Sequence, residues 1–490
     1  MRSSGVLLHI SSLPSPGGIG SLGQEAFQFV DFLHASGMSI WQVLPIGPTG
    51  YGESPYQSSS VFAGNPLLIS CRKLREEGLL SYEDQEEYIP GSEDRVDYDL
   101  VRENKTMLLR RCYDQSASAL RNAVSDFCRN NPWVGDFALF TAVKAHFGNI
   151  MFSAWPDRDI LLRKPEAVRK YTEMLRDEID FHIFCQYLFR RQWFALKKYA
   201  GEHAVQLFGD MPIYVAEDSA DAWTHPEIFQ LDKNRIPKRV AGVPPDYFSA
   251  DGQLWGNPLY RWRYLRRTGY DWWISRMKGM SELYDIIRID HFIGFANYYS
   301  VRHGMPNARK GRWIVGPGKK LFQALQKSLP DIHIVAEDLG CVNARVQRLL
   351  DWCGYPGMKV MTFGFDSDKT NPHYIGNYRS NTVAYTGTHD NNTTRGWAEA
   401  AAPEVLAFAG KELGFNTPEE APEAFIRALF ASPCDTVIVP MQDILGLGES
   451  ARMNYPGTIG GNWLWRMKPG DITSDLSLKY YKLNRKTNRR

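Results

Sequence analysis

Three carboxylates follow three separate strand-like runs in the second half of this chain. Asp290 ends the run IIRID, Glu337 follows HIVA, and Asp390 follows TVAYTGTH. Each run is apolar or β-branched and then breaks into polar, glycine-containing sequence, which is typical of a strand end. In a (β/α)8 barrel the catalytic groups lie at the C-terminal ends of the strands. Three acids at three such ends indicate chemistry on a glycosidic bond, which needs paired carboxylates.

The segment RID places an arginine close to the first of these acids. Residues i and i+2 of a strand point to the same side, so Arg288 and Asp290 should both face the barrel interior. A guanidinium beside a carboxylate lowers its pKa and keeps it ionised, as a nucleophile at an anomeric carbon must be. A structural ion pair inside the barrel explains this pattern equally well.

The segment AEDLG contains two neighbouring acids that should point to opposite sides of the chain. Glu337 has the longer side chain and the higher reference pKa, which favours it as a general acid that protonates a leaving oxygen. Asp338 is predicted to cap the N-terminus of the following helix, whatever Glu337 does.

The segment TGTHDNNTTRGW places His389 beside Asp390. Their expected role is to form hydrogen bonds with sugar hydroxyls that strengthen as the transition state develops. An ordinary polar turn is the alternative interpretation, and Asn391 and Asn392 favour it.

The elements that would position these acids alternate regularly along the chain. Helix-like segments separate most of the apolar runs, and several end at glycine or a polar breaker. This alternation predicts an α/β protein built as a (β/α)8 TIM barrel. A doubly wound open sheet is the alternative, and it needs a nucleotide-binding turn or a switch-point crevice. The predicted strands cover residues 6–10, 41–46, 204–208, 285–289, 333–336, 358–365, 382–387 and 436–441.

Two intervals between strands are too long for simple crossovers. Residues 72–200 are charged and helical in pattern, which predicts a mainly helical insertion after the second strand. Residues 211–283 are rich in proline, glycine and aromatic side chains, as expected of an aromatic loop and helix insertion after the third strand, over the cleft. We place both insertions on the C-terminal rim of a single catalytic barrel domain that covers residues 1–490.

An early glycine pattern resembles a dinucleotide-binding fingerprint. Gly18, Gly20 and Gly23 fit G-x-G-x-x-G between a strand and a helix, but a lone match is a weak signal. A dinucleotide site places the first glycine at the strand end and an acid at the end of the second strand. Here residues 11–17 intervene, and WQVLPIGP supplies no acid. We therefore interpret these glycines as shaping a loop and capping a helix, and we expect no cofactor.

The composition argues against several function classes. The 490 residues include 57 basic and 55 acidic side chains, a balance that argues against a nucleic-acid or membrane-surface partner. No apolar stretch is long enough to span a membrane, and serines and prolines interrupt the N-terminal apolar run. The seven scattered cysteines contain no CxxC pair, which predicts reduced thiols and a cytoplasmic location. Glu217, Asp218 and Asp221 cluster, but we predict a solvated loop there and no metal site.

A series of ordered motifs runs along nearly the whole chain, including LLHISSLPSPGGIGSLG, YGESPYQSSSVFAGNP, AGVPPDYFSADGQLWGNPLY, RIDHFIGF, YTGTHDNNT and GTIGGNWLWR. Together these motifs resemble the 4-α-glucanotransferases of glycoside hydrolase family 77, also called amylomaltases or disproportionating enzymes. The resemblance implies transfer of a segment of an α-1,4-glucan to the 4-hydroxyl of an acceptor glucan or glucose. It further implies a retaining double displacement through a covalent glycosyl-enzyme, with α-1,4-glucans and maltooligosaccharides as donors and acceptors.

The resemblance also implies a role for each matched residue. Asp290 matches the nucleophile, Glu337 the general acid/base, and Asp390 the group that stabilises the transition state. Residues that match positions around the sugar at the cleavage point are Tyr56, Asp210, Arg288 and His389. Residues that match adjoining subsites or the aromatic loop on the acceptor side are Trp255, Asn257, Asn462, Tyr247 and Phe248.

Three positions depart from the family's pattern. Ile293 replaces an arginine often found after DHF, and Glu53 and Asn392 stand where aspartate is common. None of these changes removes a proposed catalytic group. Ile293 alters the charge next to the nucleophile motif, and so it bears on subsite preference.

Other function classes can use the same fold. An α-1,4-glucan hydrolase of the α-amylase clan would use the same three acids, but it would convert maltotriose only into shorter sugars. A non-catalytic glucan-binding barrel can lose a catalytic carboxylate, whereas Asp290, Glu337 and Asp390 are all present. An oxidoreductase barrel is a more distant alternative, which a cofactor titration would test.

Overall fold

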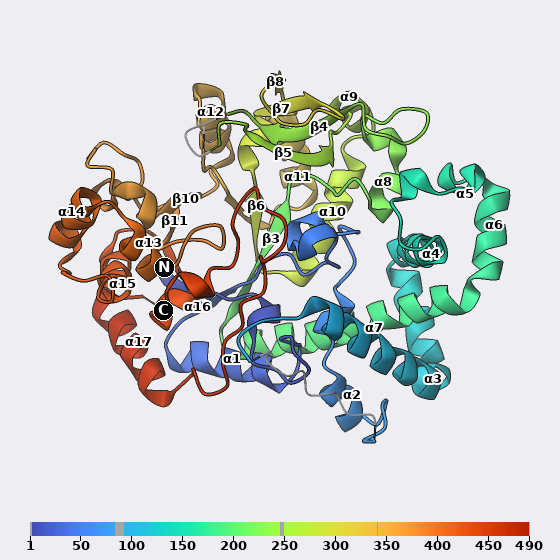
Figure 1. Ribbon diagram of the computed structural model, residues 1–490, viewed down its shortest axis with the longest axis horizontal. Coiled ribbons are helices and arrows are strands. Elements are labelled where there is room, and N and C mark those ends of the chain that lie inside the picture. The colour runs from blue at the N-terminus through green and yellow to red at the C-terminus, as the bar shows by residue number, and fades with distance from the viewer. Residues whose placement is uncertain (1, 84–92, 246–248, 341, 490) are drawn as a thin grey trace.

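The computed structural model describes residues 2–83, 93–245, 249–340 and 342–489, and its centre is an eight-stranded sheet (Figure 1). Neighbouring strands are parallel and follow the order β10-β11-β12-β1-β2-β3-β6-β9. The two ends of the sheet meet where the Ala336 amide donates a 2.9 Å hydrogen bond to the Pro356 carbonyl. The predicted TIM barrel is confirmed. Its strands are β1 (Ser3–Leu7), β2 (Ile40–Gln42), β3 (Gln206–Pro212), β6 (Ile286–Asp290), β9 (His333–Ala336), β10 (Gly357–Val360), β11 (Thr382–Tyr385) and β12 (Thr436–Pro440).

Every predicted strand has an observed counterpart, although some boundaries differ. The strand predicted at 6–10 ends at Leu7, and the strand predicted at 358–365 ends at Val360. Apolar residues beyond these ends, such as Ile10 and Met361, lie in short 3-10 helices and are fully buried. An apolar run reports burial rather than strand pairing, so it extended these two predictions too far.

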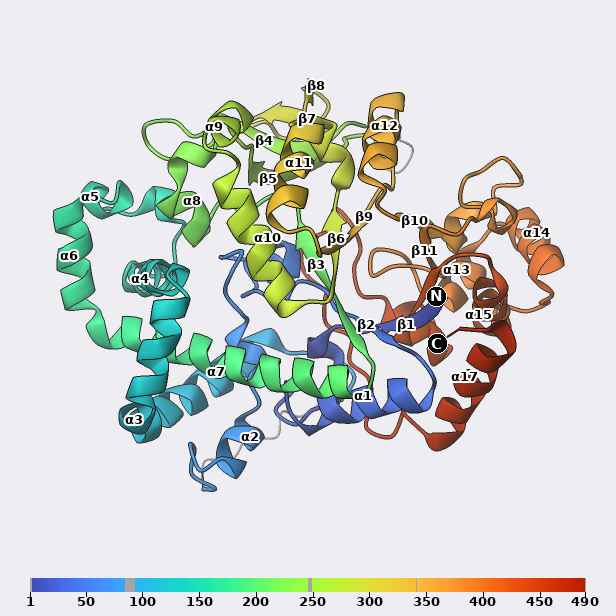
Figure 2. The same ribbon diagram turned by 180° about the vertical axis from the view of Figure 1, so that it is seen from behind.

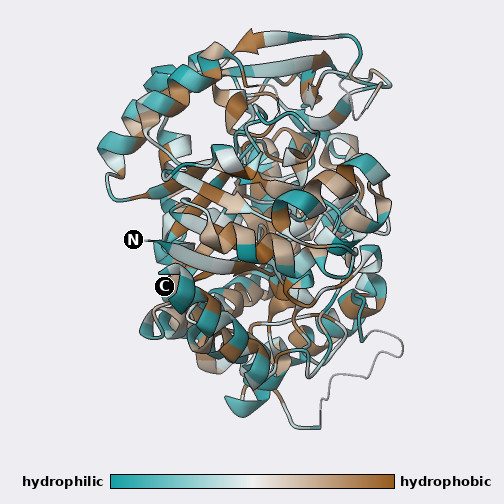
Figure 3. Cartoon of the chain, turned by 90° about the vertical axis from the view of Figure 1, so that its left-hand side faces the viewer, coloured by the Kyte–Doolittle hydropathy of each residue, from teal (hydrophilic) through white to brown (hydrophobic). Residues whose placement is uncertain are grey.

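Helices surround the barrel (Figures 1 and 2). In α11 (Lys319–Ser328), Leu321, Phe322 and Leu325 recur at helical spacing and are buried, while the lysines are exposed. Figure 3 shows the outer helices with both teal and brown segments, as expected of helices with one polar and one apolar side. The other surrounding helices include α1 (Gln24–Ala35), α7 (Arg176–Glu202), α10 (Asp271–Leu283), α12 (Ala344–Cys353), α13 (Thr394–Ala400), α14 (Pro403–Leu413), α15 (Ala421–Ala431), α16 (Met441–Ile444) and α17 (Ser474–Thr487).

The interval between β2 and β3 is mainly helical. Its longest helix, α3 (Tyr98–Asn130), packs against α7. The helix α7 also lies against α1 and leads into β3 (Figure 2), so it serves as the crossover between the second and third barrel strands. The shorter helices of this interval are α2 (Cys71–Glu76), α4 (Trp133–His146), α5 (Arg158–Leu161) and α6 (Pro165–Met174).

A second, antiparallel sheet stands above the barrel, and the sequence did not predict it. Its order is β5-β4-β7-β8, and β4 (Arg239–Val243) pairs with both β5 (Gln253–Pro258) and β7 (Asn297–Arg302). The fourth strand is β8 (Gly311–Val315). Residues 211–283 were expected to form loops and helices, and they do contain α8 (Ala220–Thr224) and α9 (Trp262–Arg267). The chain passes through both β5 and β6 between β4 and β7, and no local sequence pattern predicts a pairing between strands so far apart.

The early glycines shape a turn. Gly23 is the N-cap of α1, and the Gly20 amide donates a 2.9 Å hydrogen bond to the Ser11 carbonyl. A side chain at Gly20 would lie 1.8 Å from the carbonyl oxygen of Ile10, so the close approach of the two backbones requires glycine. The structure therefore supports the loop-shaping interpretation of these residues.

Two further observations concern the whole described chain. Within the described ranges, no helix is both long and apolar enough to cross a membrane. Free thiols are found at Cys112, Cys128, Cys185, Cys353 and Cys434, whereas Cys341 lies outside the described residues.

Candidate active site

The three acids lie at the C-terminal ends of three barrel strands. Asp290 is the last residue of β6, Glu337 directly follows β9, and Asp390 lies in the loop between β11 and α13. Strands β6 and β9 are adjacent, and the Glu337 amide donates a 3.1 Å hydrogen bond to the Ile289 carbonyl. Asp290 and Glu337 therefore lie at the same rim on neighbouring strands.

Asp290 belongs to a buried ion network with Arg288 and Asp210. Arg288 Nη1 lies 3.0 Å from Asp290 Oδ1 and 2.7 Å from Asp210 Oδ2, which confirms that Arg288 and Asp290 point to the same side. Tyr56 donates a 2.7 Å hydrogen bond to Asp210, and burial raises the pKa of Tyr56, so its hydroxyl keeps the proton. The Asp210 side chain is completely buried, so it positions Arg288 and Tyr56 from beneath the cleft.

Glu337 and Asp338 point in opposite directions, as predicted. The amides of His291 and Leu339 each donate a 2.7 Å hydrogen bond to one oxygen of Glu337. The backbone of His291 is left-handed, with φ 52° and ψ 46°, which turns the amide after Asp290 toward Glu337. Such a conformation is unusual for a residue with a side chain, and it ties the two acids together.

The predicted N-cap role of Asp338 is wrong. Its Oδ1 accepts a 2.7 Å hydrogen bond from the Met358 amide of β10. The helix α12 begins later, and Asn343 caps it by accepting hydrogen bonds from the amides of Arg345 and Val346. Asp338 thus fastens β9 to β10 at the point where the barrel closes.

The pKa of Asp290 also differs from the prediction. Burial raises the pKa of Asp290, and the charges of Asp210 and Glu337 add to this effect, whereas Arg288 opposes it. Burial likewise raises the pKa of Glu337 despite the opposing charge of Arg288. The prediction weighed only the arginine, whereas burial and the neighbouring carboxylates together outweigh it. The Asp290 side chain keeps 29% exposure, so a substrate can reach it.

Asp390 lies near the first acid, because its charge acts on Asp290. His389 Nε2 lies 3.4 Å from Asp390 Oδ1, and the imidazole stacks on the Tyr56 ring with centroids 5.1 Å apart. Burial lowers the pKa of His389, so the ring is neutral near pH 7. The polar turn of the alternative interpretation is present, because His389 and Asp390 lie in a turn that the Asn391 amide closes with a 3.2 Å hydrogen bond to the Thr388 carbonyl. The turn does not exclude a role at the site, since His389 is only 8% exposed and stacks on Tyr56.

The predicted subsite residues have different surroundings. Trp255 on β5 meets the His291 ring edge to face at 4.8 Å, so the antiparallel sheet brings an aromatic ring to the acids. Asn257 donates a 2.8 Å hydrogen bond to the Val215 carbonyl. Asn462 accepts from the Tyr455 amide at 3.0 Å and shapes its own loop. Tyr247 and Phe248 lie outside the described residues.

The three positions that depart from the family's pattern have simple surroundings. Ile293 is buried, with 4% exposure, so an apolar side chain fills this place. Glu53 forms a 2.5 Å ion pair with Arg102 of α3. Asn392 accepts a 2.9 Å hydrogen bond from the amide of the next residue, Thr393.

The acids after β3 do not converge, and the predicted solvated loop is wrong at Asp221, which is buried in α8. Asp218 pairs with Lys144, Glu217 lies 3.7 Å from His303, and Asp221 accepts a 2.9 Å hydrogen bond from the Val61 amide. In the described part of the chain, no group of three or more His, Cys, Asp or Glu is placed to hold a metal ion.

Sequence reasoning missed three residues that touch this site. Asn454 donates a 2.7 Å hydrogen bond to Asp390 Oδ1, and Arg452 donates one of 2.9 Å to the Asp390 carbonyl. Trp463 places its ring 5.9 Å from both the Tyr56 and His389 rings. Trp463 belongs to the motif GTIGGNWLWR, which was a usable signal, whereas nothing local distinguishes Asn454 in ARMNYPG.

Comparison with known proteins agrees with this geometry. The family model of glycoside hydrolase family 77, described as 4-alpha-glucanotransferase, matches residues 8–473. The chain belongs to this family. Two curated relatives of this family-77 chain carry the same description. The 4-alpha-glucanotransferase of Thermus thermophilus is 46% identical, over 97% of this chain and 96% of its own length. The chloroplastic/amyloplastic protein of Arabidopsis thaliana is 43% identical, over 95% of this chain and 81% of its own length.

Solved structures of two amylomaltases have the same fold as the family-77 chain. The amylomaltase from Streptococcus agalactiae, solved in complex with acarbose, superposes with a TM-score of 0.97 at 42% identity, and each chain is covered completely. The amylomaltase from Corynebacterium glutamicum shares the fold, with a TM-score of 0.77 at 20% identity, over 100% of this chain and 75% of its own. The family-77 chain is accordingly a glycosyltransferase acting on α-glucans, and the hydrolase alternative is not favoured.

Proposed function

We propose that this family-77 chain transfers a segment of an α-1,4-glucan to the 4-hydroxyl of an acceptor glucan or glucose, with retention at the anomeric carbon. The observation that carries the proposal is the meeting of Asp290 and Glu337 at one rim, joined through the His291 amide. A retaining mechanism needs two such carboxyl groups about 5–5.5 Å apart, and an inverting one about 6.5–9.5 Å. A crystal structure with the inverting separation would contradict the proposal.

In the first step Asp290 attacks the anomeric carbon while Glu337 gives its proton to the glycosidic oxygen. Arg288 holds Oδ1 of Asp290, which leaves Oδ2 for the attack. The bond from the anomeric carbon to the leaving glucan breaks, and an ester forms between Asp290 and the donor sugar. Burial raises the pKa of both acids, so the reactive form, with Glu337 protonated and Asp290 ionised, is one of the two singly protonated states of the pair. Asp390 accepts hydrogen bonds from the distorted sugar.

In the second step Glu337, now a carboxylate, removes the proton of an acceptor 4-hydroxyl. The acceptor oxygen attacks the anomeric carbon, Asp290 departs, and a new α-1,4 bond forms. Transfer requires that a sugar, rather than water, occupies the acceptor place. The aromatic surroundings of the cleft, among them Trp255 beside His291, support stacking of an acceptor sugar and exclusion of water.

Maltotriose as the only substrate tests this proposal directly. Transfer is expected to give glucose together with a ladder of longer maltooligosaccharides, because one molecule serves as donor and another as acceptor. Chromatography of the products over time measures this. A mixture that contains only sugars shorter than maltotriose would show hydrolysis and contradict the proposal.

The pH profile of transfer follows from the two raised pKa values. Asp290 must be ionised, so activity is lost as the pH falls through its pKa; Glu337 must be protonated, so activity is lost as the pH rises through its pKa. Since the pair interacts, the limbs of the bell-shaped profile belong to both groups. We expect both limbs of kcat/KM to lie above the ordinary carboxyl range of about 3.9–4.3.

Asp210→Asn provides the matched variant for this profile. The negative charge of Asp210 raises the pKa of Asp290, so its removal should move the acid limb to lower pH. Initial rates from about pH 3 to pH 10 measure both limbs. An acid limb that stays in place in Asp210→Asn would show that Asp210 does not influence the nucleophile.

A further inference from the structure

The carboxylate of Asp390 has one oxygen held by the protein and one open. Asn454 Nδ2 donates to Oδ1 at 2.7 Å, whereas the neutral His389 approaches the same oxygen only to 3.4 Å. Among the described residues, none donates a hydrogen bond to Oδ2, and the side chain of Asp390 is 44% exposed. Asn454 is thus the short protein contact that orients this carboxylate, and Oδ2 is left for a substrate hydroxyl.

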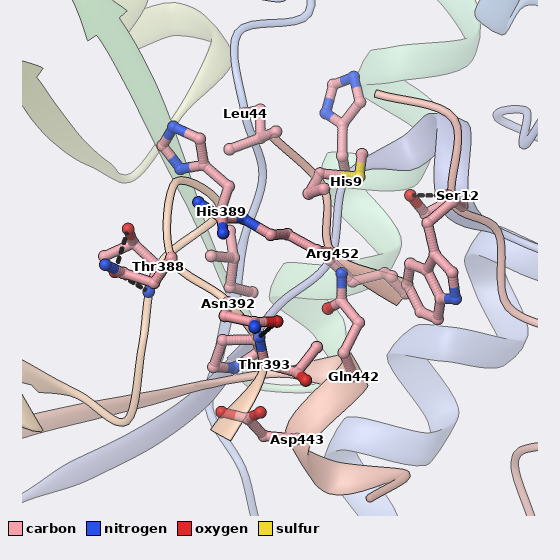
Figure 4. A pocket seen from close by; sticks show the side chains of 16 residues that line it. His9, Ser12, Leu44, Thr388, His389, Asn392, Thr393, Gln442, Asp443 and Arg452 are labelled. Atoms are coloured by element: carbon pink, nitrogen blue, oxygen red, sulfur yellow. Dashed lines mark hydrogen bonds between the residues drawn. The ribbon is translucent and has the colours of Figure 1, made fainter. Parts of the chain in front are cut away.

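Arg452 connects Asn454 to the backbone of the same acid. Its Nε donates a 2.8 Å hydrogen bond to the Asn454 carbonyl, and its Nη2 donates one of 2.9 Å to the Asp390 carbonyl. Its guanidinium also lies over the Tyr455 ring, 4.1 Å from the centroid. Figure 4 shows the Arg452 side chain extending across a small pocket toward His389. One short segment, residues 452–454, therefore holds both the side chain and the main chain of Asp390.

The segment 452–454 is itself anchored to the chain next to the cleft. The Trp463 amide donates a 2.7 Å hydrogen bond to the carbonyl of Met453, which is buried. Trp463 has φ 66°, a backbone conformation that bulky residues rarely adopt and that persists only where the surroundings impose it. Its ring lies against Tyr56 and His389, so the same anchor supports the stacked pair beside Asp390.

We infer that Asn454 is a positioning residue of the transfer reaction, which turns the carboxylate of Asp390 so that Oδ2 faces the sugar at the cleavage point. Arg452 fixes the position of Asn454 relative to the Asp390 backbone, because it donates hydrogen bonds to the carbonyls of both residues. The inference rests on the role proposed above for Asp390. A carboxylate stabilises a developing charge best when its oxygens are already in place, because no rotation has to be frozen during the reaction.

The test measures kcat and KM on maltotriose for Asn454→Ala, Asp390→Asn and Asn131→Ala in the full-length protein. Asn131 is the matched control, because its amide also donates a single hydrogen bond, of 2.9 Å to the Phe127 carbonyl, at the remote junction of α3 and α4. We expect Asn454→Ala to lower kcat by about 10- to 100-fold with KM changed less than about threefold. Asn131→Ala should leave both values near wild type.

Asn454→Asp supplies a readout that a merely structural role would not move. The substitution keeps the shape of the side chain but removes the Nδ2 donor to Asp390. A merely structural role would tolerate this exchange, whereas the positioning role predicts a fall in kcat of about 10- to 100-fold with KM changed less than about threefold. The charged or titratable groups that already face Asp390 are His389, Asp290, Tyr56 and Arg452, and all of them remain in this variant.

The outcomes separate this inference from the proposed function. Loss of activity in Asp390→Asn, with a kcat for Asn454→Ala within about threefold of wild type, would overturn the positioning role alone. A kcat for Asn454→Asp within about threefold of wild type would also overturn it. Activity retained in Asp390→Asn would instead contradict the role of Asp390 itself. If Asn454→Ala fails to fold, shown by its thermal melt, Asn454→Asp still decides the matter.

Discussion

Asp290→Ala is expected to lower the rate of glucan transfer by at least about 10⁴-fold, because no other group can form the covalent glycosyl-enzyme. Arg288, the ion-pair partner of Asp290, and Glu337, the proposed acid, both remain, but neither supplies the missing nucleophile. The rate of glucose release from maltotriose measures the loss. The large effect distinguishes a reacting carboxylate from one that only balances the charge of Arg288.

Adding azide to Asp290→Ala tests more specifically whether the removed carboxylate was the nucleophile. With maltosyl fluoride as donor, azide should enter the space of the removed carboxylate and attack the anomeric carbon as fluoride departs. The product should be a maltosyl azide of inverted configuration, which nuclear magnetic resonance identifies. An azide of retained configuration would place the nucleophile elsewhere.

Asp285→Asn is the matched control for this experiment. Asp285 lies next to the opposite end of β6, where its Oδ2 accepts a 2.8 Å hydrogen bond from the Leu207 amide. The same change of charge there should leave transfer within a few-fold of wild type. Comparable losses in both variants would indicate damage to β6 rather than loss of a nucleophile.

Glu337→Gln is expected to slow transfer from maltotriose by about 10²–10⁴-fold, the usual contribution of a general acid or base. Glutamine keeps an oxygen that can accept from the His291 or Leu339 amide, but it cannot give a proton to the leaving glucan. Maltosyl fluoride needs no such proton, so this donor should still form the glycosyl-enzyme. Without a base the second step is slow, and mass spectrometry of the intact protein should detect the maltosyl adduct.

Asp338→Asn is the control for Glu337, because the two acids are neighbours in sequence and point apart. Asparagine can still accept the hydrogen bond from the Met358 amide, so transfer should stay within a few-fold of wild type. A loss in Asp338→Asn as large as that in Glu337→Gln would show that the acid/base role does not belong to Glu337 alone. If Glu337→Gln forms no adduct with maltosyl fluoride, the general acid/base role proposed for Glu337 is contradicted.

Sequence reasoning predicted contacts between residues that are close together along the chain, and it missed contacts between residues that are far apart. Arg288 and Asp290 are two residues apart on one strand, so the strand period alone placed them on the same side, and the ion pair confirms it. The opposite directions of Glu337 and Asp338 follow from the same rule. The helix cap at Asp338 failed because its true partner, Met358, comes from the next strand of the closed barrel.

The sequence by itself determined the barrel, its strands and the three acids at its rim, because burial and alternation leave a periodic trace along the chain. Only the tertiary structure decided the pKa values of Asp290 and Glu337, because burial raises both and charges distant in sequence, such as Asp210, act on Asp290. The tertiary structure also brought Asn454 to Asp390, across 64 positions of the chain. Contacts of that range arise from closure of the fold, and a single sequence carries no local mark of them.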